Sequence, residues 1–348
     1  MQIDFKHRLS AHCESGVSSN LLFHYGVDIS EAMAFGIGAG LFFGYLPFIR
    51  INHLPLTTFR CEVGGILKRL SRKLGVKIHF EKFRNPEKAM AALDRSLESG
   101  IPVGCRTGAY WLPYFPSAYR FHFNMHNLVV YGKEGDAYLI SDPVFPETQR
   151  CSQKDLMKAR FAQGALAPKG TMYYLTHVPR DIDLRGPIYK GIKEVCHRML
   201  KIPGPIIGVR GMRFLAGQVE KWPRKLGKRK ASLYLGQLVR MQEELGTGGA
   251  GFRFMYAAFL QESAGILNEN RLLDLSGKMT QVGDLWRRFA VIGARNCKGR
   301  ASESDSFGAM ADILRDCARK ETEIYRELLT VENMERHVHY RKTQTYHH

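Results

Sequence analysis

The stretch "HNLVVYGKEGDAYLISD", residues 126–142, decides the fold of the N-terminal half because it has the pattern of a β-hairpin. We take "GKEGD" as the loop and centre the turn on Glu134, so that Val130 faces Tyr138 and His126 faces Asp142. Directly opposed side chains of an antiparallel pair share one face, with Cβ atoms about 4.5–5.5 Å apart. The pattern therefore predicts that the Asp142 carboxylate accepts the Nδ1 proton of His126.

A histidine–aspartate pair on a sheet becomes catalytic only beside a nucleophile, and "RLSAHCESGVSSNLLFHYG", residues 8–26, offers Cys13. Apolar residues recur near a 3.6 period over 15–26, which predicts a helix directly after Cys13. The unpaired N–H groups and the dipole at a helix start favour a thiolate. The order Cys13, His126, Asp142 follows the logic of papain-like enzymes. The alternative is a small buried thiol with a structural histidine–aspartate pair.

Elements outward from the hairpin give an α+β fold for the first half. The segment 76–83 alternates like a strand, and 85–100 has the signals of a helix with Asn85 as N-cap and Pro86 as first residue. Further strands are expected at "IPVGCRTG", "AYLISDP" and "GTMYYLTHV". We therefore predict helices followed by an antiparallel sheet, in a domain spanning residues 1–180.

Beyond Pro187 the sequence changes to amphipathic helices, among them "YKGIKEVCHRMLK", "GVRGMRFLAGQVEKW" and "GFRFMYAAFLQESAGIL". We predict a mostly α-helical domain over residues 187–335 that covers the cleft of the first domain, followed by a frayed tail at 336–348. The uncharged stretch 32–49 is short for a membrane span and holds four glycines and a proline. We expect it to form a buried helix that runs into a glycine-rich wall.

The net charge of +18 indicates an acidic partner, such as an anionic membrane, an acidic protein or a nucleic acid. No RNA-binding motif accompanies the charge, so we expect no specific nucleic acid. The seven cysteines are scattered without a CxxC pair, which favours a reducing compartment over disulfides or a structural metal site. The N-terminus shows no signal peptide pattern. We expect a cytoplasmic protein, with a peripheral location at the inner membrane as a second expectation.

The sequence resembles the N-terminal domain of the butirosin biosynthesis protein H family, which is similar to papain-like cysteine peptidases. The resemblance rests on "AHCESGVSSNLLFHYGVDISEAMAFGIGAGLFFGY", on "WLPYFP" at 111–116, and on His126 and Asp142 with Pro143. The helical half is similar to the uncharacterised domain that commonly follows. The named family member moves an aminoacyl group from the phosphopantetheine thioester of an acyl carrier protein to an amine.

The resemblance implies that Cys13 attacks a thioester, that His126 relays protons, and that an amine resolves the acyl-enzyme. No bound cofactor is expected, and the acyl donor would be a carrier protein or coenzyme A thioester. Basic residues including Arg224, Lys225 and Lys228 would attract an acidic carrier protein. Two other functions stay open: a cysteine hydrolase acting on a peptide, amide or thioester, and a non-catalytic basic binding module.

Several other residues are candidates for auxiliary roles. His7 occupies the place where papain-like enzymes commonly carry a glutamine that donates to the oxyanion, and His12 is a second oxyanion candidate. His122 is the alternative base. Glu31 is expected to be structural, and the glycines at 36–40 follow no strand and lack GK[ST], which excludes a phosphate loop. Three aromatic residues are candidates for an acyl pocket: Tyr110, Trp111 and Tyr114.

Overall fold

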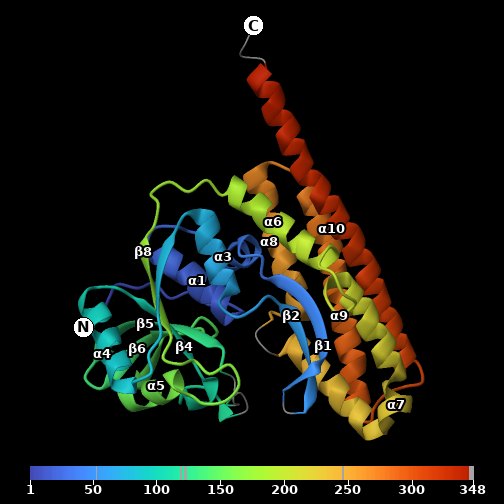
Figure 1. The fold of residues 1–348 in the computed structure, drawn as a ribbon, viewed down its shortest axis with the longest axis horizontal. Helices are drawn as coiled ribbons and strands as arrows, with labels where there is room; N and C mark the ends of the chain where they lie inside the picture. The colour runs from blue at the N-terminus through green and yellow to red at the C-terminus, as the bar shows by residue number, and fades with distance from the viewer. Residues whose placement is uncertain (52, 118–119, 121–123, 245–246, 345–348) are drawn as a thin grey trace. The chain divides into compact units, whose positions relative to one another are not determined.

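The computed structural model describes residues 1–51, 53–117, 120, 124–244 and 247–344, with side chains described through Val331. The chain divides into two compact units (Figure 1). Unit 1 comprises residues 1–34 and 63–182, and unit 2 comprises residues 35–62 and 183–348. Residues 35–62, which the sequence analysis placed with the N-terminal half, therefore pack with the helices that follow residue 182.

Unit 1 is built on a six-stranded antiparallel sheet in the order β3-β8-β4-β5-β6-β7. Its helices and the short 3-10 turn η1 connect and flank these strands, so the expected α+β architecture is confirmed. The strands are β3 (Lys77–Glu81), β4 (Val103–Thr107), β5 (His126–Glu134), β6 (Ala137–Ser141), β7 (Gln149–Ser152) and β8 (Met172–His177). The helices are α1 (Cys13–His24), α3 (Gly65–Leu74), η1 (Ala109–Trp111), α4 (Pro86–Glu98) and α5 (Gln153–Arg160).

The core of unit 1 forms where apolar side chains of the sheet meet those of α4 and α5. Leu93 of α4, Leu128 of β5, Ile140 of β6 and Leu156 of α5 are fully buried members of this cluster. Helix α4 begins as predicted, because the Asn85 side chain accepts the Lys88 N–H at 2.7 Å and Pro86 occupies the first helical position. These signals depend only on residues that are neighbours in the chain, which is why the helix start was predicted correctly.

The hairpin β5–β6 exists, but its predicted register is wrong. The turn has two residues, Gly135 and Asp136, and Gly135 adopts φ +58°, a conformation that glycine accepts readily. This turn alone would pair Val130 with Ser141, and the observed partner is Ile140 rather than the predicted Tyr138. A bulge between Val130 and Gly132 then shifts the pairing by one residue.

The expected buried helix over 32–49 is also wrong. Helix α2 (Glu31–Ile37) is short, and strands β1 (Leu41–Ile51) and β2 (Leu54–Arg60) form an antiparallel hairpin. The glycines of this stretch serve close packing: a Cβ on Gly36 would lie 2.0 Å from the Phe259 ring. A continuous apolar run does not distinguish a buried strand from a buried helix, which explains the error.

Within its described residues, unit 2 contains the β1–β2 hairpin and five helices. These are α6 (Arg185–Leu200), α7 (Gly208–Glu243), α8 (Arg253–Leu267), α9 (Arg271–Cys297) and α10 (Phe307–Gln344), with η3 (Ala250–Phe252) before α8. The rings of Phe43 and Phe59 from the hairpin contact Trp286 of α9. Helix α7 contains a kink at Gly227 (φ 73°, ψ 160°), and α9 was not predicted.

Two further expectations concern the ends and the membrane. The predicted frayed tail is helical as far as Gln344, and residues 345–348 lie outside the described residues. Among the described helices, none combines the length and apolar character needed to cross a bilayer.

Candidate active site

Cys13 is the first residue of α1, and the loop before it is fixed by a buried carboxylate. Glu31 accepts the backbone N–H groups of Ala11 at 2.8 Å and His12 at 2.7 Å, and it also accepts the Ser15 hydroxyl at 2.9 Å. Burial raises the pKa of Glu31, and these hydrogen bonds oppose that rise. The structural role expected for Glu31 is therefore to hold the turn that delivers Cys13.

A second carboxylate anchors α1 from the position after the cysteine. Glu14 is buried and accepts the backbone N–H groups of Gly64 at 3.0 Å and Ile66 at 2.9 Å, at the N-terminus of α3. A carboxylate at a helix start satisfies unpaired N–H groups and complements the helix dipole. This contact was not predicted, because it joins residues about fifty positions apart.

His126 and Asp142 form the predicted pair through a different nitrogen. His126 Nε2 lies 2.7 Å from Asp142 Oδ2, and both side chains are buried. The predicted use of Nδ1 is thus wrong, and Nδ1 takes no part in the bond to Asp142. Asp142 follows the last residue of β6 and is diagonal to His126, a separation that longer side chains bridge.

Two further donors hold the Asp142 carboxylate. The Tyr114 hydroxyl donates to Oδ2 at 2.8 Å, and the Val144 N–H donates to Oδ1 at 3.3 Å. Burial and the neighbouring Asp142 charge raise the pKa of Tyr114 well above its usual range, so its hydroxyl stays a donor. The carboxylate is therefore fully buried yet satisfied on both oxygens.

The buried Asp142 carboxylate changes the pKa of His126. Burial by itself lowers the pKa of the imidazole, but the charge and hydrogen bond of Asp142, together with Cys13 as a further hydrogen-bond partner, raise it to about 10. The ring is therefore an imidazolium at neutral pH. A positive ring beside a thiol stabilises the thiolate, which is the reactive form of cysteine.

The sulfur of Cys13 lies among groups of strand β5. Its thiol is 3.9 Å from the Met125 carbonyl oxygen, and Asn127 Nδ2 donates to Sγ at 3.9 Å and to the Met125 oxygen at 3.1 Å. The Tyr173 hydroxyl donates to Asn127 Oδ1 at 3.0 Å, which orients the amide so that its nitrogen faces the sulfur. Asn127 and Tyr173 were not predicted to be part of the site, although Asn127 directly follows His126 in the sequence.

The auxiliary histidines have structural positions or lie outside the described residues. His7 uses both ring nitrogens, Nδ1 with Ser141 Oγ at 2.8 Å and Nε2 with the Phe145 oxygen at 2.9 Å, so it holds the segment on either side of Asp142. His12 is the N-cap of α1, and its Nδ1 accepts the Ser15 N–H at 3.3 Å. His122 lies outside the described residues. Cys13, as first residue of α1, has an N–H with no acceptor inside the helix, which suits an oxyanion donor.

The three aromatic candidates for an acyl pocket lie in different settings. Tyr114 bonds to Asp142, as described above, and Trp111 packs against the core with Lys158 Nζ 5.6 Å from its ring centre. The Arg120 guanidinium lies 5.7 Å from the ring centre of Tyr110. Phe115, which was not predicted, places its ring edge-on to His126 at a centroid distance of 5.2 Å and helps to shield the pair.

Among the described residues, no three or more His, Cys, Asp or Glu side chains are grouped so that they could hold a metal ion. The site instead combines a thiol at a helix start, an imidazolium and a buried carboxylate. This arrangement is suited to nucleophilic attack and proton transfer.

Several solved structures are distantly similar to this chain, and two of them are described here in turn. A Bacillus anthracis structure described as a C39-like peptidase is 13% identical, with a TM-score of 0.37, and covers 51% of this chain and 100% of its own. The peptidase domain of Streptococcus ComA, a bifunctional ABC transporter involved in quorum sensing, is 17% identical, with a TM-score of 0.32, and covers 51% of this chain and 99% of its own. Among curated proteins, none matches this sequence.

Two family models match the chain, one for each part of the sequence. Residues 12–143 match the model for butirosin biosynthesis protein H, N-terminal, which confirms the resemblance based on the motifs around Cys13 and His126. Residues 154–328 match the model named Domain of unknown function (DUF4872). Because this second match spans half of the chain, the protein belongs to the DUF4872 family, with an N-terminal region of the butirosin biosynthesis protein H type.

Proposed function

We propose that this protein is a cysteine-dependent N-acyltransferase that moves an acyl group from a phosphopantetheine thioester to an amine through an acyl-Cys13 intermediate. The observation that carries the proposal is the buried 2.7 Å hydrogen bond between His126 and Asp142 beside a cysteine at a helix start. The papain-like superfamily of cysteine acyltransferases and peptidases is the coarser class that the family match supports.

The first half-reaction forms the acyl-enzyme. The Cys13 thiolate attacks the thioester carbonyl carbon, and the carbonyl oxygen becomes an oxyanion to which the Cys13 N–H would donate. The C–S bond to phosphopantetheine then breaks, and the His126 imidazolium gives its proton to the departing thiolate. The products are a Cys13 thioester, a free phosphopantetheine thiol and a neutral His126.

The second half-reaction forms the amide. The acceptor amine attacks the acyl-Cys13 carbonyl, and neutral His126 takes the proton that the amine nitrogen loses. Collapse of the tetrahedral intermediate breaks the C–S bond and returns the Cys13 thiolate and the His126 imidazolium. Asp142 remains ionised throughout and stabilises the imidazolium state.

Transfer and hydrolysis share the first half-reaction and differ in the acceptor. Thioester exchange with Cys13 is nearly neutral in free energy, and amide formation from a thioester runs downhill, so a transferase must mainly exclude water and orient the amine. The match to a butirosin biosynthesis protein favours transfer, since such a protein belongs to a biosynthetic route. Carrier protein and coenzyme A are both donors of the required chemistry.

The experiment is intact-protein mass spectrometry after incubation with a panel of acyl-phosphopantetheine and acyl-coenzyme A thioesters. We expect the wild type to gain the mass of one acyl group and to release it as an amide only after an amine is added. Cys13→Ser should show no such gain. Cys297→Ser is the matched control, because Cys297 is an exposed cysteine far from α1 in sequence, and this variant should acylate like the wild type.

The outcomes separate the three functions. Equal acylation of wild type and Cys13→Ser contradicts the proposed nucleophile. Loss of the acyl group at the same rate with and without amine identifies a hydrolase instead. A protein that takes up no acyl group from any thioester in the panel, and whose thiols all react alike, is a binding module.

A further inference from the structure

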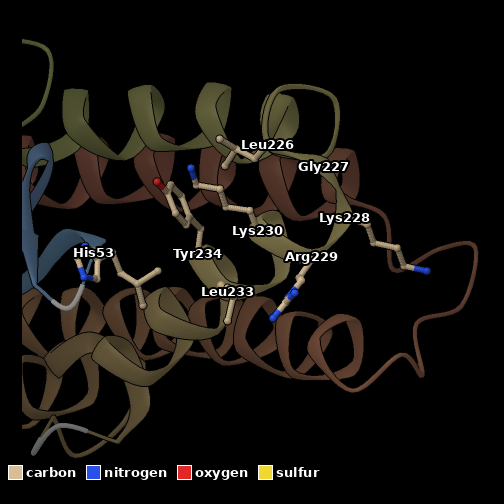
Figure 2. Close-up of a pocket in the computed structure, with 9 residues that line it drawn as sticks. His53, Leu226, Gly227, Lys228, Arg229, Lys230, Leu233 and Tyr234 are labelled. Atoms are coloured by element: carbon tan, nitrogen blue, oxygen red, sulfur yellow. The ribbon is translucent and has the colours of Figure 1, made fainter.

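A shallow hollow of about 640 Å³ lies in unit 2, where the turn of the β1–β2 hairpin meets the kink of α7 (Figure 2). His53 and Leu54 contribute from the hairpin, and residues 226–230 with Leu233 and Tyr234 contribute from α7. A neighbouring hollow of about 480 Å³ shares Leu54, Arg229 and Leu233 with the first. The two hollows therefore form one continuous surface, which we call the kink groove.

The kink groove carries a concentration of positive charge. Gly227 breaks the helix with φ 73°, and the three residues after it, Lys228, Arg229 and Lys230, are all exposed. In Figure 2 the Lys228 side chain extends outward from the kink, and Lys230 Nζ lies 5.9 Å from the centre of the Tyr234 ring. From residue 221 to residue 242 the sequence holds seven Lys or Arg and no Asp or Glu, so the local field is strongly positive.

The kink groove also exposes an apolar side chain beside the charges. Leu233 is 55% exposed although it lies on a helix whose other face is buried. On the β1 strand that leads to the hairpin turn, the irregular pairing between Leu46 and Arg50 leaves Phe48 70% exposed and Ile49 42% exposed. Exposed aromatic and aliphatic side chains next to lysines and arginines are the combination that binds at a lipid–water interface.

We infer that the kink groove docks on an anionic phospholipid bilayer surface. Phosphate-bearing headgroups satisfy the charges of Lys228, Arg229 and Lys230, while the acyl-chain boundary accepts Leu233. An acidic protein or a free phosphate would also complement the charges. Only a lipid–water interface offers phosphates directly beside an apolar layer for the exposed Leu233. This inference is independent of the chemistry at Cys13.

The test is sedimentation of the full chain with vesicles of phosphatidylcholine alone and of phosphatidylcholine with about 30% phosphatidylserine. We expect binding to the anionic vesicles only, weakened by raised salt. Each basic residue near an anionic surface strengthens binding about fivefold, so Lys228→Ala/Arg229→Ala/Lys230→Ala should bind on the order of 100-fold more weakly. Leu233→Ser should weaken binding several-fold at a salt concentration that screens the charges.

A matched control removes the same charge elsewhere. Lys82, Arg84 and Lys88 are exposed basic residues of unit 1, and their triple alanine variant lowers the net charge equally. We expect this variant to bind anionic vesicles within a few-fold of the wild type. Both triple variants should have the far-ultraviolet circular dichroism spectrum and the urea unfolding midpoint of the wild type, which shows that each is folded.

A probe within the groove reports the docking face directly. Cys297 lines the neighbouring hollow and is exposed, so an environment-sensitive fluorophore attached to it in a Cys13→Ser background should shift to the blue on anionic vesicles. Failure of the wild type to bind these vesicles overturns the inference. So does equal loss of binding in the two triple variants, or an unshifted probe on bound protein, because each places the contact elsewhere or attributes it to net charge alone.

Discussion

Asp142 in unit 1 and Glu321 in unit 2 are both buried carboxylates that bond to a cationic side chain and accept a tyrosine hydroxyl. Asp142 bonds to a histidine ring and a tyrosine hydroxyl. Glu321 accepts Arg253 at 2.9 and 3.0 Å, the Trp286 indole N–H at 3.0 Å and the Tyr325 hydroxyl at 2.9 Å. Both carboxylates are fully buried.

The difference lies in what the cationic partner faces next. The third nitrogen of Arg253 donates to the Gly251 oxygen at 2.8 Å, so each of its three nitrogens donates to a group inside unit 2. His126 uses one ring nitrogen for Asp142, and Cys13 contributes to the raised pKa of the imidazole. We therefore propose that His126 acts on Cys13 through the ring nitrogen that does not bond to Asp142, whereas Arg253 has a structural role.

The largest effect on the reaction is expected from removing the imidazole ring of His126. His126→Gln should lower the rate of Cys13 acylation by about 10²–10⁴-fold, the usual contribution of a general acid–base. The rate is measured by intact-protein mass spectrometry with a thioester that acylates the wild type. A loss of less than threefold would place the proton transfer on another group.

The Arg253–Glu321 pair in unit 2 should contribute to stability and have no effect on the reaction at Cys13. Glu321→Gln leaves Arg253 charged and uncompensated, so the free energy of unfolding in urea should fall by about 3–5 kcal/mol. The double variant Arg253→Met/Glu321→Leu should recover most of that loss. A cost below about 1 kcal/mol for the single change would mean that the pair is not buried as described.

The pH dependence of stability should also separate the two pairs. The pKa of His126 is raised from 6.5 to about 10, so its stabilising contribution is complete below pH 6.5 and is lost as the pH rises to about 10. Asp142→Asn removes the main raising cause. The difference in unfolding free energy between wild type and Asp142→Asn should therefore narrow from pH 6 to pH 10, by more than about 1 kcal/mol; a constant difference would contradict the imidazolium.

The smallest effect concerns the amide that faces the sulfur. Asn127→Ala should lower the rate of Cys13 alkylation by about five- to tenfold, equivalent to one hydrogen bond, and Tyr173→Phe should do so less because it only frees the amide to rotate. Asn124→Ala is the matched control, since its buried amide donates to the Gln163 and Ala165 oxygens instead. Equal effects of Asn124→Ala and Asn127→Ala would reduce Asn127 to a packing role.

The sequence predicted the pair His126–Asp142 although the register was wrong, and strand geometry explains why. The turn Gly135–Asp136 alone would put Asp142 opposite Val129, on the face away from His126. The bulge between Val130 and Gly132 shifts the pairing so that Asp142 is level with Leu128, on the same face as His126. The wrong turn and the missed bulge together shift the predicted pairing by two residues. Because side chains alternate between the two faces of a strand, a shift of two residues leaves Asp142 on the predicted face.

Contacts between distant residues were beyond sequence reasoning. The Asn85 cap and the Cys13 helix start are set by neighbours in the chain, so they were predicted. Glu14 on the α3 N-terminus and Tyr173 on Asn127 depend on how helices and strands pack, which a single sequence does not display. The β1–β2 hairpin was missed because its apolar run has no period that separates strand from helix.

The most direct test of the central claim is the pH profile of alkylation at Cys13, followed by peptide mass spectrometry with exposed Cys297 as the internal reference. We expect iodoacetamide to modify Cys13 rapidly at pH 6–7, where Cys297 reacts slowly, and we expect this advantage to disappear in His126→Gln. A Cys13 that reacts no faster than Cys297 at pH 6–7, or whose rate is unchanged in His126→Gln, would contradict the thiolate–imidazolium pair.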